Sequence, residues 1–149
     1  MKLKLARALK EKNRLVGEIN RIKALINREN SRNVTSSSKV DCAKLWTELE
    51  DVSDKLVVLK TAIFKANAGI YGKIVLLGEL KDMVTWIEDI PTTNGIFEKD
   101  TYGGVTRKEE FTAFVKQEDI DGKTVEMQKL IATTQDEVDE YNAKTEIDI

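Results

Sequence analysis

The sequence has no histidine, and it has only one proline and one cysteine, Cys42, among its 149 residues. Without histidine the chain lacks the commonest general base and the commonest ligand for transition metals, so every catalytic triad that needs an imidazole is excluded. A single cysteine cannot form a disulfide within the chain, which agrees with a reducing compartment. With 34% charged residues and only eight glycines, the scarcity of proline predicts long uninterrupted helices.

Long apolar runs are absent as well. The longest, residues 56–59 and 74–77, are four residues each, whereas a signal peptide needs a longer apolar stretch and a membrane-spanning helix needs about 20 apolar residues. We therefore expect a cytoplasmic protein with no membrane span.

The length is that of one domain, and 41% apolar residues suffice for a core, so we expect a single helical domain over residues 1–149.

Opposite charges gather at the two ends of the chain, although the net charge is only −2. Residues 1–32 hold ten basic and three acidic side chains, a net charge of +7, and residues 118–149 hold three basic and ten acidic ones, a net charge of −7. A basic helix alone would suggest nucleic acid. Because an acidic segment accompanies it, we predict that complementary helices neutralise each other within a protomer or across an interface. The alternatives are an acidic external partner and solvated faces without a role.

Apolar residues in heptad spacing predict an antiparallel, coiled-coil-like helical hairpin in the first half of the chain. Its first helix covers about residues 3–29, residues 30–38 form a loop, and its second helix covers about residues 41–68. The pattern of the first helix weakens at its start, where Ala8 and Lys12 fall on the apolar stripe. Ser38 or Asp41 is suited to cap the second helix.

A third helix is expected over about residues 73–90, after a break at Gly69 and Gly72 and before Pro91. Ten of its seventeen residues between 74 and 90 are apolar, a stripe too wide for one neighbour, so we predict a central helix or one at an oligomer interface. The residues predicted to form the helix-packing or oligomer seam of the second and third helices are Leu45, Leu49, Val52, Leu56, Leu59, Ile63, Leu77, Leu80, Val84 and Ile87.

Residues 96–115 differ in composition from the helical segments before them. Aromatic and β-branched residues around Gly103 and Gly104, with alternation through Phe111, Ala113 and Val115, predict a small β-hairpin or arm over about residues 96–116. A fourth helix is expected over about residues 121–144. Its apolar positions also follow heptad spacing: Ile120, Thr124, Met127, Ile131, Thr134, Val138 and Tyr141.

No group of residues predicts catalysis or ligand binding. Cys42 lies where a helix dipole lowers a thiol pKa, but with no histidine in the chain we interpret it as a packed or incidental cysteine. We interpret the acidic clusters at residues 48–54 and 88–89 as solvated helix faces, because no calcium-loop spacing accompanies them. Trp46 and Trp86 adjoin the seam, so core or interface packing is expected for both. We therefore expect no enzymatic activity, no cofactor and no bound metal.

Several short motifs, in order along nearly the whole chain, carry a family resemblance. They are Met1-Lys2-Leu3, Ala6-Arg7-Ala8-Leu9, Asn13-Arg14-Leu15, Ile63-Phe64-Lys65-Ala66-Asn67-Ala68, Leu80-Lys81-Asp82, residues 107–115 and 138–142, and Thr145-Glu146-Ile147. The chain resembles the uncharacterised bacterial proteins called septicolysins. The resemblance implies an extended helical protomer with a small β element that assembles into a homo-oligomer, and it implies no established activity.

Three functional hypotheses follow from the sequence. We favour a self-assembling cytoplasmic helical protein with a scaffold or protein-interaction role, which binds neither nucleic acid nor a small molecule. The alternative is a membrane-active, toxin-like protein, suggested only by the name of the family. The third is an enzyme or metal protein that uses carboxylates and Cys42.

Overall fold

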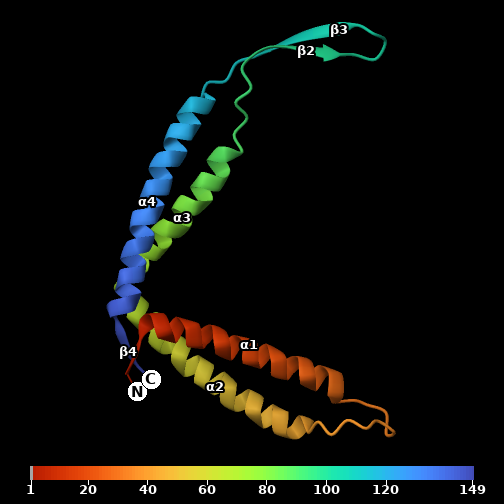
Figure 1. Ribbon diagram of the computed structural model, residues 1–149, viewed down its shortest axis with the longest axis vertical. Coiled ribbons are helices and arrows are strands. Elements are labelled where there is room, and N and C mark those ends of the chain that lie inside the picture. Colours follow the sequence, from red (N-terminus) through yellow and green to blue (C-terminus); the bar gives the residue numbers. More distant parts are fainter. Residues whose placement is uncertain (1) are drawn as a thin grey trace. The chain divides into compact units, whose positions relative to one another are not determined.

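The computed structural model describes residues 2–149 and is mainly helical, with 66% of the chain in four helices and a small antiparallel β-hairpin (Figure 1). The fold class expected from the sequence, mainly α with a small β arm, is confirmed. The elements in order are β1 (Lys2–Lys4), α1 (Leu5–Glu29), α2 (Cys42–Asn67), α3 (Tyr71–Glu88), β2 (Gly95–Asp100), β3 (Thr106–Phe111), α4 (Gln117–Lys144) and β4 (Glu146–Asp148). Met1, with which the family resemblance begins, lies outside the described residues.

The chain forms two compact units. The first comprises Met1–Tyr71 and Val138–Ile149, and the second comprises Gly72–Glu137. The single domain over residues 1–149 that the length of the chain predicts stays a prediction.

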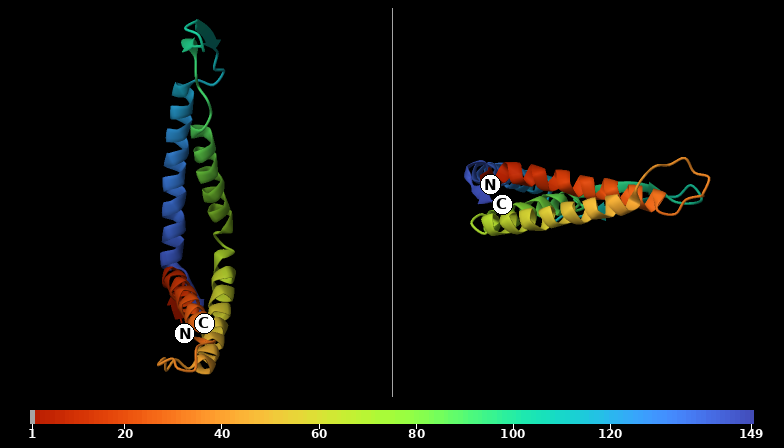
Figure 2. Two further views of the ribbon diagram at one scale, coloured as in Figure 1. Left: turned by 90° about the vertical axis from the view of Figure 1, so that its right-hand side faces the viewer. Right: turned by 90° about the horizontal axis from the view of Figure 1, so that it is seen from below.

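In the first unit α1 and α2 lie side by side and antiparallel, as the heptads predict (Figures 1 and 2). Apolar side chains of both helices and of the strands β1 and β4 form one core cluster. Its buried members are Leu3, Leu5, Ala8, Leu15, Ile22, Val52, Leu56, Leu59, Ile63 and Ile147. Burial of these side chains is the main term that holds the hairpin closed.

The free backbone amides at the starts of α1 and α2 are hydrogen-bonded in different ways. At the start of α2 the carboxylate of Asp41 accepts a hydrogen bond of 3.1 Å from the backbone amide of Lys44, so of the two predicted caps Asp41 is the one used. At the start of α1 no side chain caps the helix. Instead the amide of Leu5 donates to the carbonyl of Thr145 at 2.8 Å.

The prediction that the first helix begins at residue 3 is wrong, because Lys2–Lys4 is the strand β1. It pairs antiparallel with β4 in the register Lys2↔Asp148, Leu3↔Ile147 and Lys4↔Glu146. The central pair is buried, and the ammonium of Lys4 lies 2.9 Å from the carboxylate of Glu146. This pairing, which the sequence analysis missed, joins the two ends of the described chain.

A close contact fixes the end of α2 against the last turns of α4. The hydroxyl of Tyr141 donates to the carbonyl of Ala66 at 2.9 Å and so satisfies one of the carbonyls that a helix end leaves free. A Cβ atom on Gly69 would lie only 2.5 Å from that hydroxyl. A larger residue at position 69 would therefore displace the tyrosine hydroxyl.

In the second unit α3 and the first part of α4 run antiparallel (Figure 1). Lys73 and Glu137 join them at one end with an ion pair of 2.6 Å. At the other end the hydroxyl of Thr92 donates to the side-chain oxygen of Gln117 at 2.7 Å. Within residues 72–137 the buried side chains are Leu77, Ile87, Ile120 and Thr134.

Two predicted boundaries of this unit are wrong. The strand β3 ends at Phe111 instead of continuing to Val115, because the amide of Ala113 leaves the ladder and donates to the side chain of Asn94 at 3.2 Å. The fourth helix begins at Gln117 rather than at residue 121. Asp119 stabilises this earlier start, since its carboxylate accepts from the amide of Lys116 at 3.2 Å.

The strands β2 and β3 form the predicted hairpin. Gly103 and Gly104 have φ angles of 105° and 78°, a conformation that favours glycine and so places the turn. The rings of Phe97 and Phe111 meet edge to face with centroids 6.0 Å apart. Two strands without a further partner are marginally stable in water.

Candidate interaction surfaces

The predicted seam of α2 faces α1. Val52, Leu56, Leu59 and Ile63 are buried, and Leu45 and Leu49 are half-buried and packed against the same cluster. These six residues therefore form the packing face of the hairpin in the first unit.

The predicted seam of α3 is less completely covered. Leu77 and Ile87 are buried and Leu80 and Val84 are half-buried. With 3.6 residues per turn these four positions lie on one side of the helix, and Lys73, which pairs with Glu137 of α4, lies on that side too. The seam of α3 thus faces the side on which α4 lies. A contact between this seam and a copy of the chain stays a prediction.

A second apolar face of α3 was not singled out by the heptad analysis. It consists of Val75, Leu76, Met83 and Trp86, which helical geometry brings to one side around the exposed carboxylate of Glu79. All four are exposed, Met83 by 45% and Trp86 by 60%. The excess width of the apolar stripe in the sequence was the signal that a second face existed.

The predicted core role of the tryptophans is wrong, because Trp46 is exposed like Trp86. The indole of Trp46 donates to the carboxylate of Glu50 at 2.9 Å, an interaction between neighbouring turns of α2. An interface role for either tryptophan stays a prediction.

The β arm also exposes large apolar side chains. Within the segment 95–115 they are Ile96, Phe97, Tyr102, Val105, Phe111, Phe114 and Val115. Counted over residues 2–149, fourteen of the large exposed apolar side chains lie in the second unit and seven in the first. Where exposed apolar side chains gather into one patch they mark interaction sites in soluble proteins, so the second unit is the candidate for such a site.

The charges of α1 are partly neutralised within that helix. The guanidinium of Arg14 contacts Glu11 at 2.8 Å and Glu18 at 2.6 Å, and Arg28 contacts Glu29 at 2.7 Å. The hydrogen bond from Arg14, with smaller contributions from the charges of Arg14 and Arg7, holds the pKa of Glu11 below its usual value. One ion pair, Arg21 with Glu48 at 3.5 Å, joins α1 to α2.

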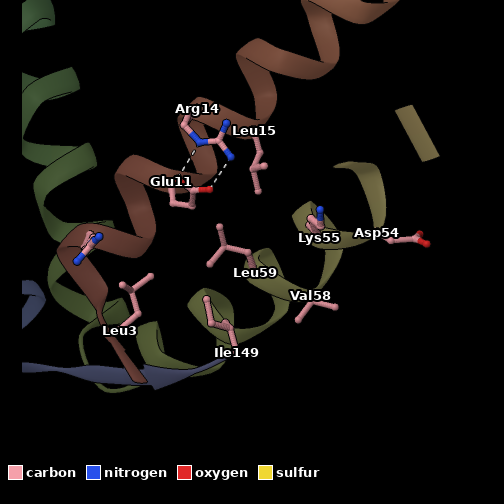
Figure 3. A pocket seen from close by; sticks show the side chains of 10 residues that line it. Leu3, Glu11, Arg14, Leu15, Asp54, Lys55, Val58, Leu59 and Ile149 are labelled. Atoms are coloured by element: carbon pink, nitrogen blue, oxygen red, sulfur yellow. Dashed lines mark hydrogen bonds and ion pairs between the residues drawn. The ribbon is translucent and has the colours of Figure 1, made fainter. Parts of the chain in front are cut away.

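A cavity of about 640 Å³ opens in the first unit beside the hairpin and the β1–β4 sheet. Figure 3 shows Leu3, Leu15, Leu59 and Ile149 around it, with Val58 at its edge. The polar side chains that line it are Arg7, Glu11, Arg14, Asp54 and Lys55. No local pattern in the sequence indicated this cavity, because its lining combines residues from β1, α1, α2 and the end of the described chain.

The residues considered for metal or thiol chemistry are not gathered into a site. Cys42 is a free, half-buried cysteine at the first position of α2. Among residues 2–149 no three acidic or cysteine side chains are placed so that they could hold a metal ion. In the same part of the chain no helix is long and apolar enough to cross a membrane.

Comparison with known proteins gives no relative from which a role could be transferred. No family model, no curated protein and no solved structure matches the chain. The resemblance to the septicolysins stays a prediction.

Proposed function

We propose that this protein is a cytoplasmic, self-assembling helical protein that serves as a scaffold or interaction module, and that its second unit forms the contacts between copies. The observation that carries the proposal is the second apolar face of α3. These side chains are 38–60% exposed, so full burial of each would gain roughly half of the about 1.5–3 kcal/mol expected for a fully exposed apolar side chain. Such a face is typical of a surface that meets a partner.

Charge supports copies of the same chain as the partner. Lys10, Lys12 and Lys23 of α1 form no ion pair within residues 2–149, and the acidic segment 118–149 carries a net charge of −7. Within a single protomer, Lys4 with Glu146 is the pair that joins the basic and acidic segments of the first unit. Contacts between copies would bring the remaining opposite charges together and set the orientation of the subunits.

The test compares two neighbouring positions of α3. Trp86→Glu places a charge on the second apolar face, and Thr85→Glu adds the same charge in the same turn on the other side of the helix, where the side chain is also exposed. We expect Trp86→Glu to weaken association by about 30-fold or more, as loss of a buried aromatic anchor does, and Thr85→Glu to leave it unchanged. Mass is measured by light scattering and sedimentation over a dilution series. A wild-type monomer at low micromolar concentration and physiological salt contradicts the proposal, as does equal behaviour of the two variants.

A further inference from the structure

The cavity of the first unit has an apolar floor and a charged rim. The floor consists of three buried side chains, Leu3, Leu15 and Leu59. They come from β1, α1 and α2, respectively (Figure 3). Its volume of about 640 Å³ lies within the range of about 300–1,000 Å³ typical of small-ligand sites. The floor therefore fits the hydrocarbon part of one small molecule.

The rim carries more cationic than acidic side chains: Arg7, Arg14 and Lys55 against Glu11 and Asp54. Arg7 on α1 and Lys55 on α2 line the cavity, and Lys55 forms no ion pair with any residue between 2 and 149. Arg14 also lines it, but its guanidinium is held by Glu11 and Glu18. Asp54 is the remaining acidic side chain at the rim, so the charge left for a ligand favours an anion of low charge.

We propose that this cavity binds a single-chain amphiphilic carboxylate, with the acyl chain against Leu3, Leu15 and Leu59 and the carboxylate at the cationic rim to which Arg7 and Lys55 belong. Arginine is suited to this because its planar donors match the geometry of a carboxylate. A neutral ligand would leave the excess positive charge of the rim without a partner, and a polyanion would gain nothing from the apolar floor. The site does not depend on the second unit, so it is independent of the proposed mode of assembly.

Binding is measured by titration calorimetry on the full-length protein with decanoate below its micellar concentration. Decyltrimethylammonium, which has the same alkyl length and a positive head, is the matched probe. We expect one decanoate per protomer and binding of decyltrimethylammonium at least about tenfold weaker, because its charge is repelled at the rim. Equal binding of both probes, or no binding of decanoate, overturns the proposal.

Two neighbouring residues of α2 offer a matched pair of variants for the apolar part. Val58 lines the cavity and is 56% exposed, while Val57 is 63% exposed and does not line it. We expect Val58→Glu to weaken decanoate binding by about tenfold or more and Val57→Glu to leave it unchanged. Because both side chains are exposed, neither change threatens the fold. An equal loss in both variants contradicts the assignment.

The rim is tested in the same way. Arg7→Gln and Lys55→Gln are each expected to weaken decanoate binding by about tenfold, the usual loss for a hydrogen bond to a charged group. Lys60→Gln, a change at an exposed lysine of α2 that does not line the cavity, is the control. The mass of the protein is followed during each titration. If decanoate dissociates the assembly as it binds, the cavity is a contact for a second copy, and the proposal is overturned.

Discussion

The two units of this protein differ in how far they satisfy their own apolar side chains. Of the fourteen buried apolar side chains within residues 2–149, eleven belong to the first unit and three, Leu77, Ile87 and Ile120, to the second. The exposed large apolar side chains show the opposite distribution. The first unit has the core of a small domain, whereas the second leaves most of its large apolar side chains exposed.

Helix length does not explain the difference, since α4 is the longest of the four helices with 28 residues. The difference lies in the partners available to each helix. The hairpin helices α1 and α2 meet along one face each, and β1 and β4 close the end of their core. The helix α3 has two apolar faces and covers only one of them, so its sequence exceeds what one neighbour can bury.

The largest effect is expected in the core of the first unit. Ile22 is completely buried, so Ile22→Ala removes packed atoms and leaves a cavity, at a cost of about 2–5 kcal/mol in the free energy of unfolding. Chemical denaturation at low protein concentration measures this cost. Lys23→Ala, at an exposed neighbour, is the control and is expected to cost little. If Trp86→Ala in the second unit costs as much as Ile22→Ala under the same conditions, the distinction between the units fails.

An intermediate effect is expected at Thr124 in the second unit. Its hydroxyl oxygen is buried and has no hydrogen-bond partner within residues 2–149. Thr124→Val removes this unsatisfied group with little change of shape and is expected to raise the free energy of unfolding by about 1 kcal/mol. Thr133→Val is the control, because the Thr133 hydroxyl is exposed and donates to the carbonyl of Lys129 at 3.1 Å. A loss of stability in Thr124→Val that depends on protein concentration would indicate instead that a second copy satisfies Thr124.

The smallest effect is the response to acid, and it is confined to the first unit. Hydrogen bonds from Arg14, Arg28 and Lys144 lower the pKa values of Glu11, Glu29 and Glu140, respectively, from 4.5. The unfolded chain therefore takes up protons at these sites before the folded chain does. Stability from these groups is present above 4.5 and is lost as pH falls through the lowered values. All three groups are solvated, so the loss is modest.

The acid response is followed by denaturant titration between about pH 7 and about pH 3.5. Arg14→Gln returns Glu11 toward its usual pKa and is expected to reduce the dependence on pH. Lys10→Gln, at an exposed residue of α1 that forms no ion pair in the described chain, is the control. Unchanged pH dependence in Arg14→Gln would contradict the assignment.

The helical hairpin was predicted well from the sequence because its apolar spacing recurs over many turns. The heptads of α2 indicate the same face in each turn, and the boundaries 41–68 expected for this helix lie within one residue of those observed. Strands of three residues offer no such repetition. The signal for β1 and β4 was the pair of motifs Lys2-Leu3-Lys4 and Glu146-Ile147-Asp148, each with a central apolar residue and with opposite charges on either side.

The candidate surfaces were predicted only in part for a similar reason. A heptad pattern identifies one apolar stripe of a helix. In α3 it identified Leu77, Leu80, Val84 and Ile87 but not Met83 and Trp86. The cavity is lined by residues of β1, α1 and α2 and by Ile149, which are far apart in the sequence. That arrangement exists only after β1 and β4 have paired, and a local pattern does not contain it.

The pairing of β1 with β4 also bears on the order of events during synthesis. The contacts of α1 with α2 link residues near one another in the sequence and form early, because closing a short loop costs little entropy. Leu3 cannot reach its partner until Ile147 has left the ribosome. Until then the walls of the cavity are incomplete, and the nascent hairpin presents apolar side chains of its core to the cell. The slowest part of folding is therefore expected at the joined ends of the chain, and chaperones that recognise apolar segments have their longest access there.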